Sequence, residues 1–224
     1  MIEEIIKEGK APNTSHQDTF ALQLIGKSGF FLDLGCRDPI DGNNSYLLEY
    51  YGWKGLLFDV NNNSIEKCKK IRSNPSFCID VNSSKFLEVL NEFLPKNNIV
   101  DFISLDIDGP LGRGIPLVLS NLLNTIEFKC MTYEHDLYAH IVHNKECLNR
   151  KESREILTKF GYFNLFPDVK WSLSEDRDTR FEDWWINPKF FPKELIDIKK
   201  QTQTSWDIIN TIKQKNEKFN ISSY

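Results

Sequence analysis

Two short apolar runs that each carry an acid constrain the fold of this chain more than any other feature. The first run is Phe31-Leu32-Asp33-Leu34-Gly35, and the second is Leu56-Leu57-Phe58-Asp59-Val60. A buried parallel strand is a nearly continuous hydrophobic segment, and ligands of open α/β sheets bind just beyond the carboxyl ends of such strands. The two runs therefore predict neighbouring strands that end beside a ligand.

The spacing of the two acids favours a nucleoside-like ligand. Asp59 follows Asp33 by 26 residues (59 − 33), close to the interval of about 20 residues at which a dinucleotide fold places its ribose-binding carboxylate. Only Gly35 is present where the motif G-x-G-x-x-G needs three glycines, and the chain has no G-x-x-x-x-G-K-[ST] loop. A nucleoside without phosphates, such as S-adenosylmethionine, fits this pattern.

The composition limits the kinds of binding partner and the cellular compartment that we expect for this protein. The 224 residues carry a formal net charge of −4, which argues against nucleic acid bound through its phosphates. The chain has no run of 18 apolar residues, and its amino-terminal segment is too charged for a signal peptide. The five cysteines form no C-x-x-C pair, as in a reducing compartment. We expect a cytoplasmic protein with no membrane partner and no nucleic-acid partner.

Strand-like and helix-like runs alternate from Gly29 onward, which predicts βαβ units and a mostly parallel sheet. We expect five strands, at 29–34, 54–60, 76–81, 100–107 and 128–135. We expect helices at about 44–51, 63–72, 84–94, 113–125 and 146–160. Two later apolar runs, 162–169 and 181–187, predict an antiparallel hairpin that completes seven strands.

The order of these elements predicts one main domain with short additions. We expect a helical extension at 1–28, the main domain at 29–190, and a docking helix with a polar tail at 191–224. Apolar residues in the last segment follow helical spacing, which favours a helix that packs on the domain.

Seven strands, acids at the ends of the first two, and no phosphate loop describe the class I methyltransferase layout. From about Ser15 to Pro188 the chain resembles the FkbM-type family of S-adenosylmethionine-dependent methyltransferases. The segments that carry the resemblance are Gln17-Asp18, Gly29 to Gly35, Asn44 to Glu49, Gly52 to Asp59, Ser104 to Gly109, Glu134-His135 and Glu182 to Trp185. Their order and spacing matter more than any one of them. The resemblance implies an α/β fold with a Rossmann-like seven-stranded sheet, mostly parallel with a C-terminal antiparallel hairpin.

The same resemblance implies a binding site for S-adenosyl-L-methionine. Asp33 and Gly35 would flank the methionine part of the cofactor, and Asp59 would bind the ribose hydroxyls. Asp80 and Val81 would meet the adenine, although Asp80 has the alternative role of a turn acid at the end of its strand. The expected cofactor site also includes Gln17, Asp18 and Ser45.

The transfer site is expected at the ends of the fourth and fifth strands. Asp106 would contact the cofactor or orient the acceptor, and His135 is the candidate general base, because imidazole titrates near neutral pH. An equal alternative for His135 is a cap of the strand or a hydrogen bond to Asp108. The expected acceptor is a hydroxyl of a glycan or of a related small molecule.

A metal site is a further possibility at the same place. Asp106, Asp108 and Glu134 offer hard oxygen ligands of the kind that Mg²⁺ prefers. Clustered acids also occur without ions.

Three other classes of protein remain open. Asp106-Ile107-Asp108-Gly109 resembles the first motif of haloacid-dehalogenase-type phosphatases, although Pro110 replaces the expected threonine. A nucleotide-sugar transferase that holds a metal through D-x-D is a second alternative. A methyltransferase-like domain that binds without turnover is the third. The interpretation that unites most motifs is an S-adenosylmethionine-dependent O-methyltransferase.

Overall fold

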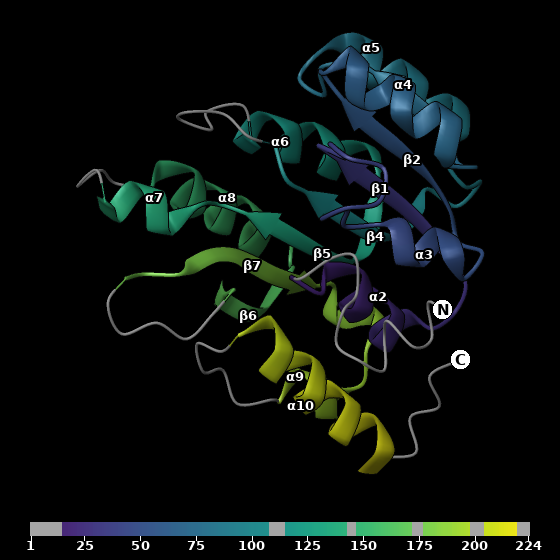
Figure 1. Cartoon of the computed structure of the whole chain (residues 1–224). Coiled ribbons are helices and arrows are strands. Elements are labelled where there is room, and N and C mark those ends of the chain that lie inside the picture. Colours follow the sequence, from purple (N-terminus) through teal and green to yellow (C-terminus); the bar gives the residue numbers. More distant parts are fainter. Residues whose placement is uncertain (1–14, 108–114, 143–146, 172–176, 198–203, 219–224) are drawn as a thin grey trace.

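The computed structural model describes residues 15–107, 115–142, 147–171, 177–197 and 204–218. These residues form one seven-stranded sheet with helices on both faces (Figure 1). The strands are β1 (Phe30–Leu34), β2 (Lys54–Asp59), β3 (Ser76–Cys78), β4 (Ile99–Leu105), β5 (Glu127–Glu134), β6 (Phe163–Lys170) and β7 (Arg180–Ile186). Their order across the sheet is β3-β2-β1-β4-β5-β7-β6.

The pairing confirms the predicted fold class. β1 to β5 pair in parallel, whereas β7 lies antiparallel between β5 and β6. All seven strands overlap the predicted ranges. The third strand ends at Cys78, earlier than expected, because the chain turns at Asp80, whose backbone oxygen accepts the Ser83 amide.

The described helices are α2 (Gln17–Ile25), α3 (Tyr46–Tyr50), α4 (Asn62–Ile71), α5 (Ser84–Phe93), α6 (Ile115–Thr125), α7 (Leu137–Val142), α8 (Leu148–Lys159), α9 (Lys193–Ile196) and α10 (Ser205–Lys218), with a 3-10 turn η1 (Pro188–Phe190). The predicted helices correspond to α3, α4, α5, α6 and α8. The sequence pattern did not reveal α7, whose six residues are too few for a periodic signal. No helix in these described ranges has the length and apolarity needed to cross a membrane.

The sheet has a hydrophobic core on each face, which explains why its strands are continuously apolar. Leu32 and Phe58 pack on the face covered by α5, α6 and α8, whereas Phe31 and Leu57 pack on the face covered by α2, α3, α4 and α10. Consecutive strand residues thus enter different cores, as the two-residue strand period requires.

The same alternation separates two adjacent tryptophans of β7. Trp185 belongs to the core under α6 and α8, and Trp184 belongs to the core under α2 and α10. Both are at most 1% exposed, so both are core residues. The fold therefore leaves the carboxyl ends of β1, β2 and β4 as the place where polar side chains gather.

Candidate functional site

A cavity of about 470 Å³ opens at the carboxyl ends of β1 and β2. Its volume lies within the range of small-ligand pockets. One side is apolar and the other is polar. The lining residues are Gly35, Arg37, Phe58, Asp59, Val60, Asn61, Ser64, Ile79, Asp80, Val81, Asp106 and Ile107. Four predicted cofactor residues, Gly35, Asp59, Asp80 and Val81, are among them.

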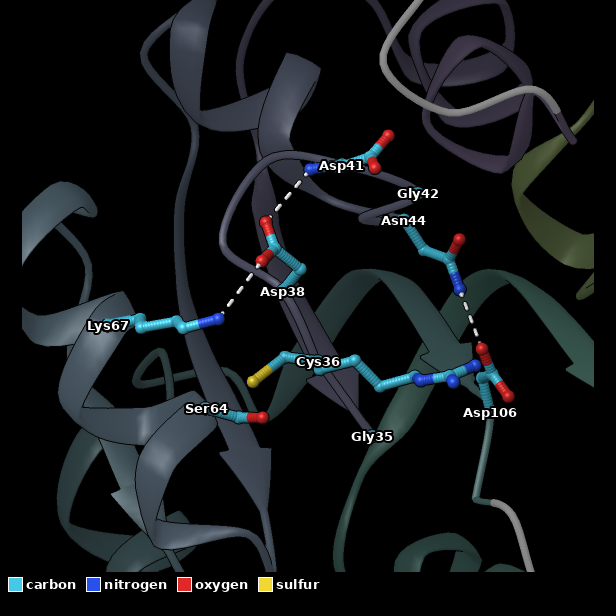
Figure 2. A pocket seen from close by; sticks show the side chains of 10 residues that line it. Gly35, Cys36, Asp38, Asp41, Gly42, Asn44, Ser64, Lys67 and Asp106 are labelled. Atoms are coloured by element: carbon cyan, nitrogen blue, oxygen red, sulfur yellow. Dashed lines mark hydrogen bonds and ion pairs between the residues drawn. The ribbon is translucent and has the colours of Figure 1, made fainter.

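A second cavity of about 400 Å³ adjoins the first and is strongly polar (Figure 2). It is lined by Gly35, Cys36, Arg37, Asp38, Asp41, Gly42, Asn44, Ser64, Lys67 and Asp106. Four residues line both spaces: Gly35, Arg37, Ser64 and Asp106. The two cavities therefore lie next to each other, and we call them together the double cavity.

Asp59 lies at the end of β2 with its carboxylate fixed by the backbone. The Arg37 amide donates to Oδ2 at 2.8 Å, and the Asn61 amide donates to Oδ1 at 2.7 Å. Each carboxylate oxygen has two lone pairs, so both oxygens keep the capacity to accept one more hydrogen bond. The geometry suits a ligand that presents two adjacent hydroxyl groups.

Gly35 follows β1 with φ of 96°, a left-handed conformation that glycine adopts at little cost. Its amide and that of Cys36 both donate to the Phe58 oxygen, at 2.9 and 3.0 Å. The space in which a β-carbon would lie is filled by the backbone of Asp106. Glycine at this position thus lets the ends of β1 and β4 meet at the floor of the double cavity.

Asp33, by contrast, lies beneath the double cavity and does not line it. Its side chain is fully buried and accepts hydrogen bonds from Ser45 Oγ at 2.6 Å and Asn43 Nδ2 at 3.3 Å. Burial raises the pKa of Asp33, while the Ser45 hydrogen bond and the Arg72 charge oppose that rise. The structure therefore connects Asp33 to the site through Ser45, which belongs to the same buried network.

Arg72, which the sequence pattern did not reveal, organises that network. Its side chain is 0% exposed and forms an ion pair with Glu49 at 2.8 Å. The guanidinium also donates to the Pro39 oxygen, to Asn43 Oδ1 and to Ser45 Oγ, at 3.2, 2.9 and 3.1 Å. Arg72 thus ties the loop after β1, which forms a wall of the double cavity, to α3 and to the end of α4.

Asp106 directly follows β4 and lies against the loop after β1. Asn44 Nδ2 lies 3.0 Å from Ser104 Oγ and 3.5 Å from Asp106 Oδ2, and Figure 2 shows the Asn44 amide directed at Asp106. The Asp106 amide donates to the Leu34 oxygen at 2.9 Å, which continues the ladder between β1 and β4. Asp106 is the one predicted transfer residue that the structure places in the double cavity.

A row of carboxyl groups continues from Asp106 across the sheet. Leu105 pairs with Tyr133 in the parallel ladder, so Asp106 lies beside Glu134, and Glu134 pairs with Glu182. Burial, followed by the charges of Asp106, Asp136 and Glu182, raises the pKa of Glu134 to about 11. Burial and the neighbouring charges thus both favour the protonated form of the Glu134 carboxyl group.

Glu182 is held in place by two donors. Gln17 Nε2 lies 3.1 Å from Oε2, and Trp184 Nε1 lies 2.6 Å from Oε1. Burial raises the pKa of Glu182 well above its usual value, although these two hydrogen bonds oppose the rise. Gln17 thus supports the acidic row and does not line the double cavity.

Asp18 is fully buried at the start of α2 and also lies outside the cavity lining. Burial raises its pKa to about 7, against hydrogen bonds from the Thr19 amide and hydroxyl. Its Oδ2 atom has no hydrogen-bond partner in the described part of the chain.

Asp80, unlike Asp18, is exposed at the rim of the double cavity. Its Oδ1 accepts a hydrogen bond from the Asn82 amide in a tight turn.

His135 does not reach the double cavity. Its side chain is 0% exposed, and its Nδ1 accepts the Leu137 amide at 3.2 Å. A nitrogen that accepts carries no proton, so Nε2 is the protonated one in the neutral ring. Nε2 faces Asp183 Oδ1 at 3.4 Å and Asp168 Oδ1 at 3.6 Å. These carboxylates come from the C-terminal hairpin.

His135, Asp168 and Asp183 are close enough to hold a metal ion, but two arginines already neutralise the carboxylates. Arg150 donates to both oxygens of Asp168, at 2.7 and 2.6 Å. Arg154 donates to both oxygens of Asp183, also at 2.7 and 2.6 Å. Although burial raises the pKa of Asp183, Arg154 and His135 hold that pKa below its usual value. A cation would compete with two bidentate guanidinium groups here.

The third predicted metal ligand, Asp108, lies outside the described residues. Asp106 follows Leu105, which pairs with Tyr133, the residue before Glu134. Among the residues that line the double cavity, the sequence interpretation missed Arg37, Asn44, Ser64 and Lys67. Their only sequence signal is their position in the segments after the first two strands.

The sheet order, with the antiparallel seventh strand between the fifth and the sixth, matches the class I methyltransferase fold. A proposed rRNA methylase from Clostridium thermocellum shares it, with 10% identity, coverage of 78% of this chain and 95% of that chain, and a TM-score of 0.51. The plantazolicin methyltransferase BamL was solved with S-adenosylhomocysteine and a triazolic desmethylPZN analogue, and it has the same fold. The two sequences are 11% identical, the match covers 78% of this chain and 84% of BamL, and the TM-score is 0.51. No family model and no curated protein matches the sequence.

Proposed function

We propose that this chain is an S-adenosylmethionine-dependent O-methyltransferase of the FkbM type. The cofactor binds in the double cavity, and the acceptor is a hydroxyl group of a glycan or of a related small molecule. The observation that carries the proposal is the position of Asp59, whose two oxygens are fixed at the polar edge of a cavity with an apolar wall. The shared fold with BamL, which was solved with S-adenosylhomocysteine, supports the same cofactor.

The first cavity suits the adenosine part of the cofactor. Phe58, Ile79, Val81 and Ile107 provide an apolar wall for the adenine, and Asp59 accepts from the two ribose hydroxyls. The second cavity suits the amino-acid part, which carries both an ammonium and a carboxylate group. Its lining contains both charges that such a zwitterion needs: the cations Arg37 and Lys67, and the acids Asp38, Asp41 and Asp106.

The acceptor would approach from the side of Asp106 and Glu134, where the sheet edge continues past the cofactor. Methyl transfer is a displacement at carbon, so the enzyme gains most by aligning the acceptor oxygen with the methyl group and removing its proton. Asp106 orients the acceptor in this proposal. A net charge of −4 disfavours a polyanionic acceptor.

The predicted general base requires a change of position to act. His135 Nε2 faces Asp183 and Asp168 in a fully buried cluster, so it has no path to a proton in the double cavity in this conformation. The proposal therefore does not depend on His135.

The test is binding of S-adenosylhomocysteine, measured by thermal unfolding and by calorimetry. Ligand at 100 times its dissociation constant should stabilise the protein by about 2.7 kcal/mol. Asp59→Asn should remove most of this effect, because an amide replaces one of the two accepting oxygens with a donor. Glu66→Gln is the matched control, since Glu66 lies on α4, pairs with Lys69 and does not line the double cavity. Absence of a shift at saturating ligand would refute the proposed cofactor.

A further inference from the structure

Two cysteine thiols lie in contact beside the double cavity. Cys36 Sγ and Cys68 Sγ are 3.9 Å apart. Cys36 directly follows Gly35 in the loop after β1, and Cys68 lies on α4. Cys36 is 2% exposed and Cys68 is 0% exposed, and both belong to the core that α2, α3 and α4 cover. The contact therefore joins a cavity wall to the helix that supplies Ser64 and Lys67.

Packing alone would explain two buried thiols, but Cys36 is not sealed inside the core. Figure 2 shows it among the side chains that line the polar cavity. Cys36 is therefore the member of the pair that lies next to the cavity, although only 2% of its surface is exposed. The remaining cysteines, at 78, 130 and 147, have no thiol partner at this distance.

The surroundings also shift the pKa values of the two thiols in opposite directions. The hydrogen bond from Cys36 and the charge of Arg72 lower the pKa of Cys68, with burial acting in the opposite direction. The same hydrogen bond and burial raise the pKa of Cys36. The two thiols therefore differ in acidity, although the proposal stands on the contact between their sulfurs.

We propose that Cys36 and Cys68 form a reversible disulfide, and that this bond weakens cofactor binding in the double cavity. With a peroxide, one thiol is oxidised to a sulfenic acid and releases one water molecule. The other thiolate then attacks that sulfur and releases a second water. Two thiols and one hydrogen peroxide thus give one disulfide and two waters. A dithiol reductant reverses the reaction.

The expected effect on cofactor binding follows from the change in position that a disulfide would cause at residue 36. A disulfide requires the sulfurs to be about 2.05 Å apart, so the side chains of Cys36 and Cys68 must rotate toward each other, and the proposal is that the loop at residue 36 moves with them. The neighbouring Arg37 amide holds Asp59 at 2.8 Å, and the Cys36 amide holds the Phe58 oxygen at 3.0 Å. A shift at position 36 therefore disturbs the carboxylate that is proposed to bind the ribose. This effect on binding rests on the proposed function, whereas formation of the bond does not.

The experiment uses the full chain with Cys78→Ser, because Cys78 is exposed and would link two molecules. Hydrogen peroxide or diamide should give a mass loss of 2 Da from the lost hydrogens and one linked pair of peptides that contains Cys36 and Cys68. The dissociation constant for S-adenosylhomocysteine should rise at least about fivefold, the low end of typical coupling between sites. Dithiothreitol should restore it.

The control is Cys68→Ala, since Cys68 does not line the double cavity. Treated in the same way, it should show neither the link nor the loss of affinity. By reciprocity, saturating S-adenosylhomocysteine should disfavour the link in the parent protein by the same factor. Absence of the link, or a link with unchanged affinity, overturns the proposal. If the reduced protein does not bind S-adenosylhomocysteine, the proposed function is wrong, and the mass measurement still decides whether the pair is redox-active.

Discussion

A β-carbon at Gly35 would lie 1.8 Å from the carbonyl oxygen of Asp106. No real pair of such atoms approaches this closely, so the ends of β1 and β4 meet only because residue 35 has no side chain. The neighbouring glycine in the same loop is different. Gly42 also has a positive φ, of 66°, but nothing lies within 4 Å of its missing β-carbon.

This difference predicts unequal effects of two similar substitutions. Gly42→Ala should cost about 1–2 kcal/mol, the strain of a left-handed conformation. Gly35→Ala should cost more, because it adds a collision with backbone, and it should also weaken S-adenosylhomocysteine binding by displacing Asp106. Urea unfolding and calorimetry measure the two effects. Equal losses of stability in the two variants would show that β1 and β4 do not depend on this contact.

Arg72 leads to a second prediction, about the wall of the double cavity. Arg72→Met would leave Glu49 and Asp33 without their buried cation, and breaking a buried pair in this way typically costs about 3–5 kcal/mol. Lys69→Met on the same helix is the control. Lys69 pairs with Glu66 at 2.9 Å on the surface, with both side chains about half exposed, so its loss should change stability by less than about 1 kcal/mol. Urea unfolding of both variants provides the comparison, and similar losses in the two would contradict a buried anchor.

Arg72 also shows where sequence patterns stop being informative. The strands were predictable because helices cover both faces of the sheet, so each strand is continuously apolar. Asp59, Asp80 and Val81 were placed near the double cavity because strand ends follow from strand positions. The ion pair of Arg72 with Glu49 joins residues whose proximity depends on how α3 and α4 pack, and no local pattern encodes that.

The same limit applies to His135 and Asp33. His135 is buried because Asp168 and Asp183 reach it from the hairpin, which lies far along the chain. Asp33 is buried because Asn43 and Ser45 fold back over it. In both cases the sequence identified a polar residue at a strand end but could not show which distant groups would cover it.

His135 supports a third prediction. Because its ring lies in the cluster with Asp183 and not in the double cavity, His135→Gln should lower the free energy of unfolding by about 1–3 kcal/mol through lost hydrogen bonds. The dissociation constant of S-adenosylhomocysteine should remain unchanged in His135→Gln. Tyr138→Phe is the comparison variant, and Tyr138 packs against Trp171. A large loss of affinity in His135→Gln with intact stability would instead indicate that His135 belongs to the binding site.

Asp18 gives a prediction about pH. Its pKa is 3.8 in the unfolded reference and about 7 in the folded protein, because burial disfavours the charged form. Between these values the folded state binds more protons than the unfolded state, so stability falls as pH rises from about 4 to 7. The full cost of this single group at higher pH is about 4 kcal/mol, from 1.36 kcal/mol per pKa unit.

Asp18→Asn removes the titrating group while keeping the shape of the side chain. Its stability should therefore exceed that of the parent at pH 8 and match it, or fall slightly below it, at pH 4. The measurement is urea unfolding of both proteins at several pH values without cofactor, with Asp80→Asn as the control, since Asp80 is exposed. A constant difference between Asp18→Asn and the parent across this range would mean that folding does not raise the pKa of Asp18, and would contradict the prediction.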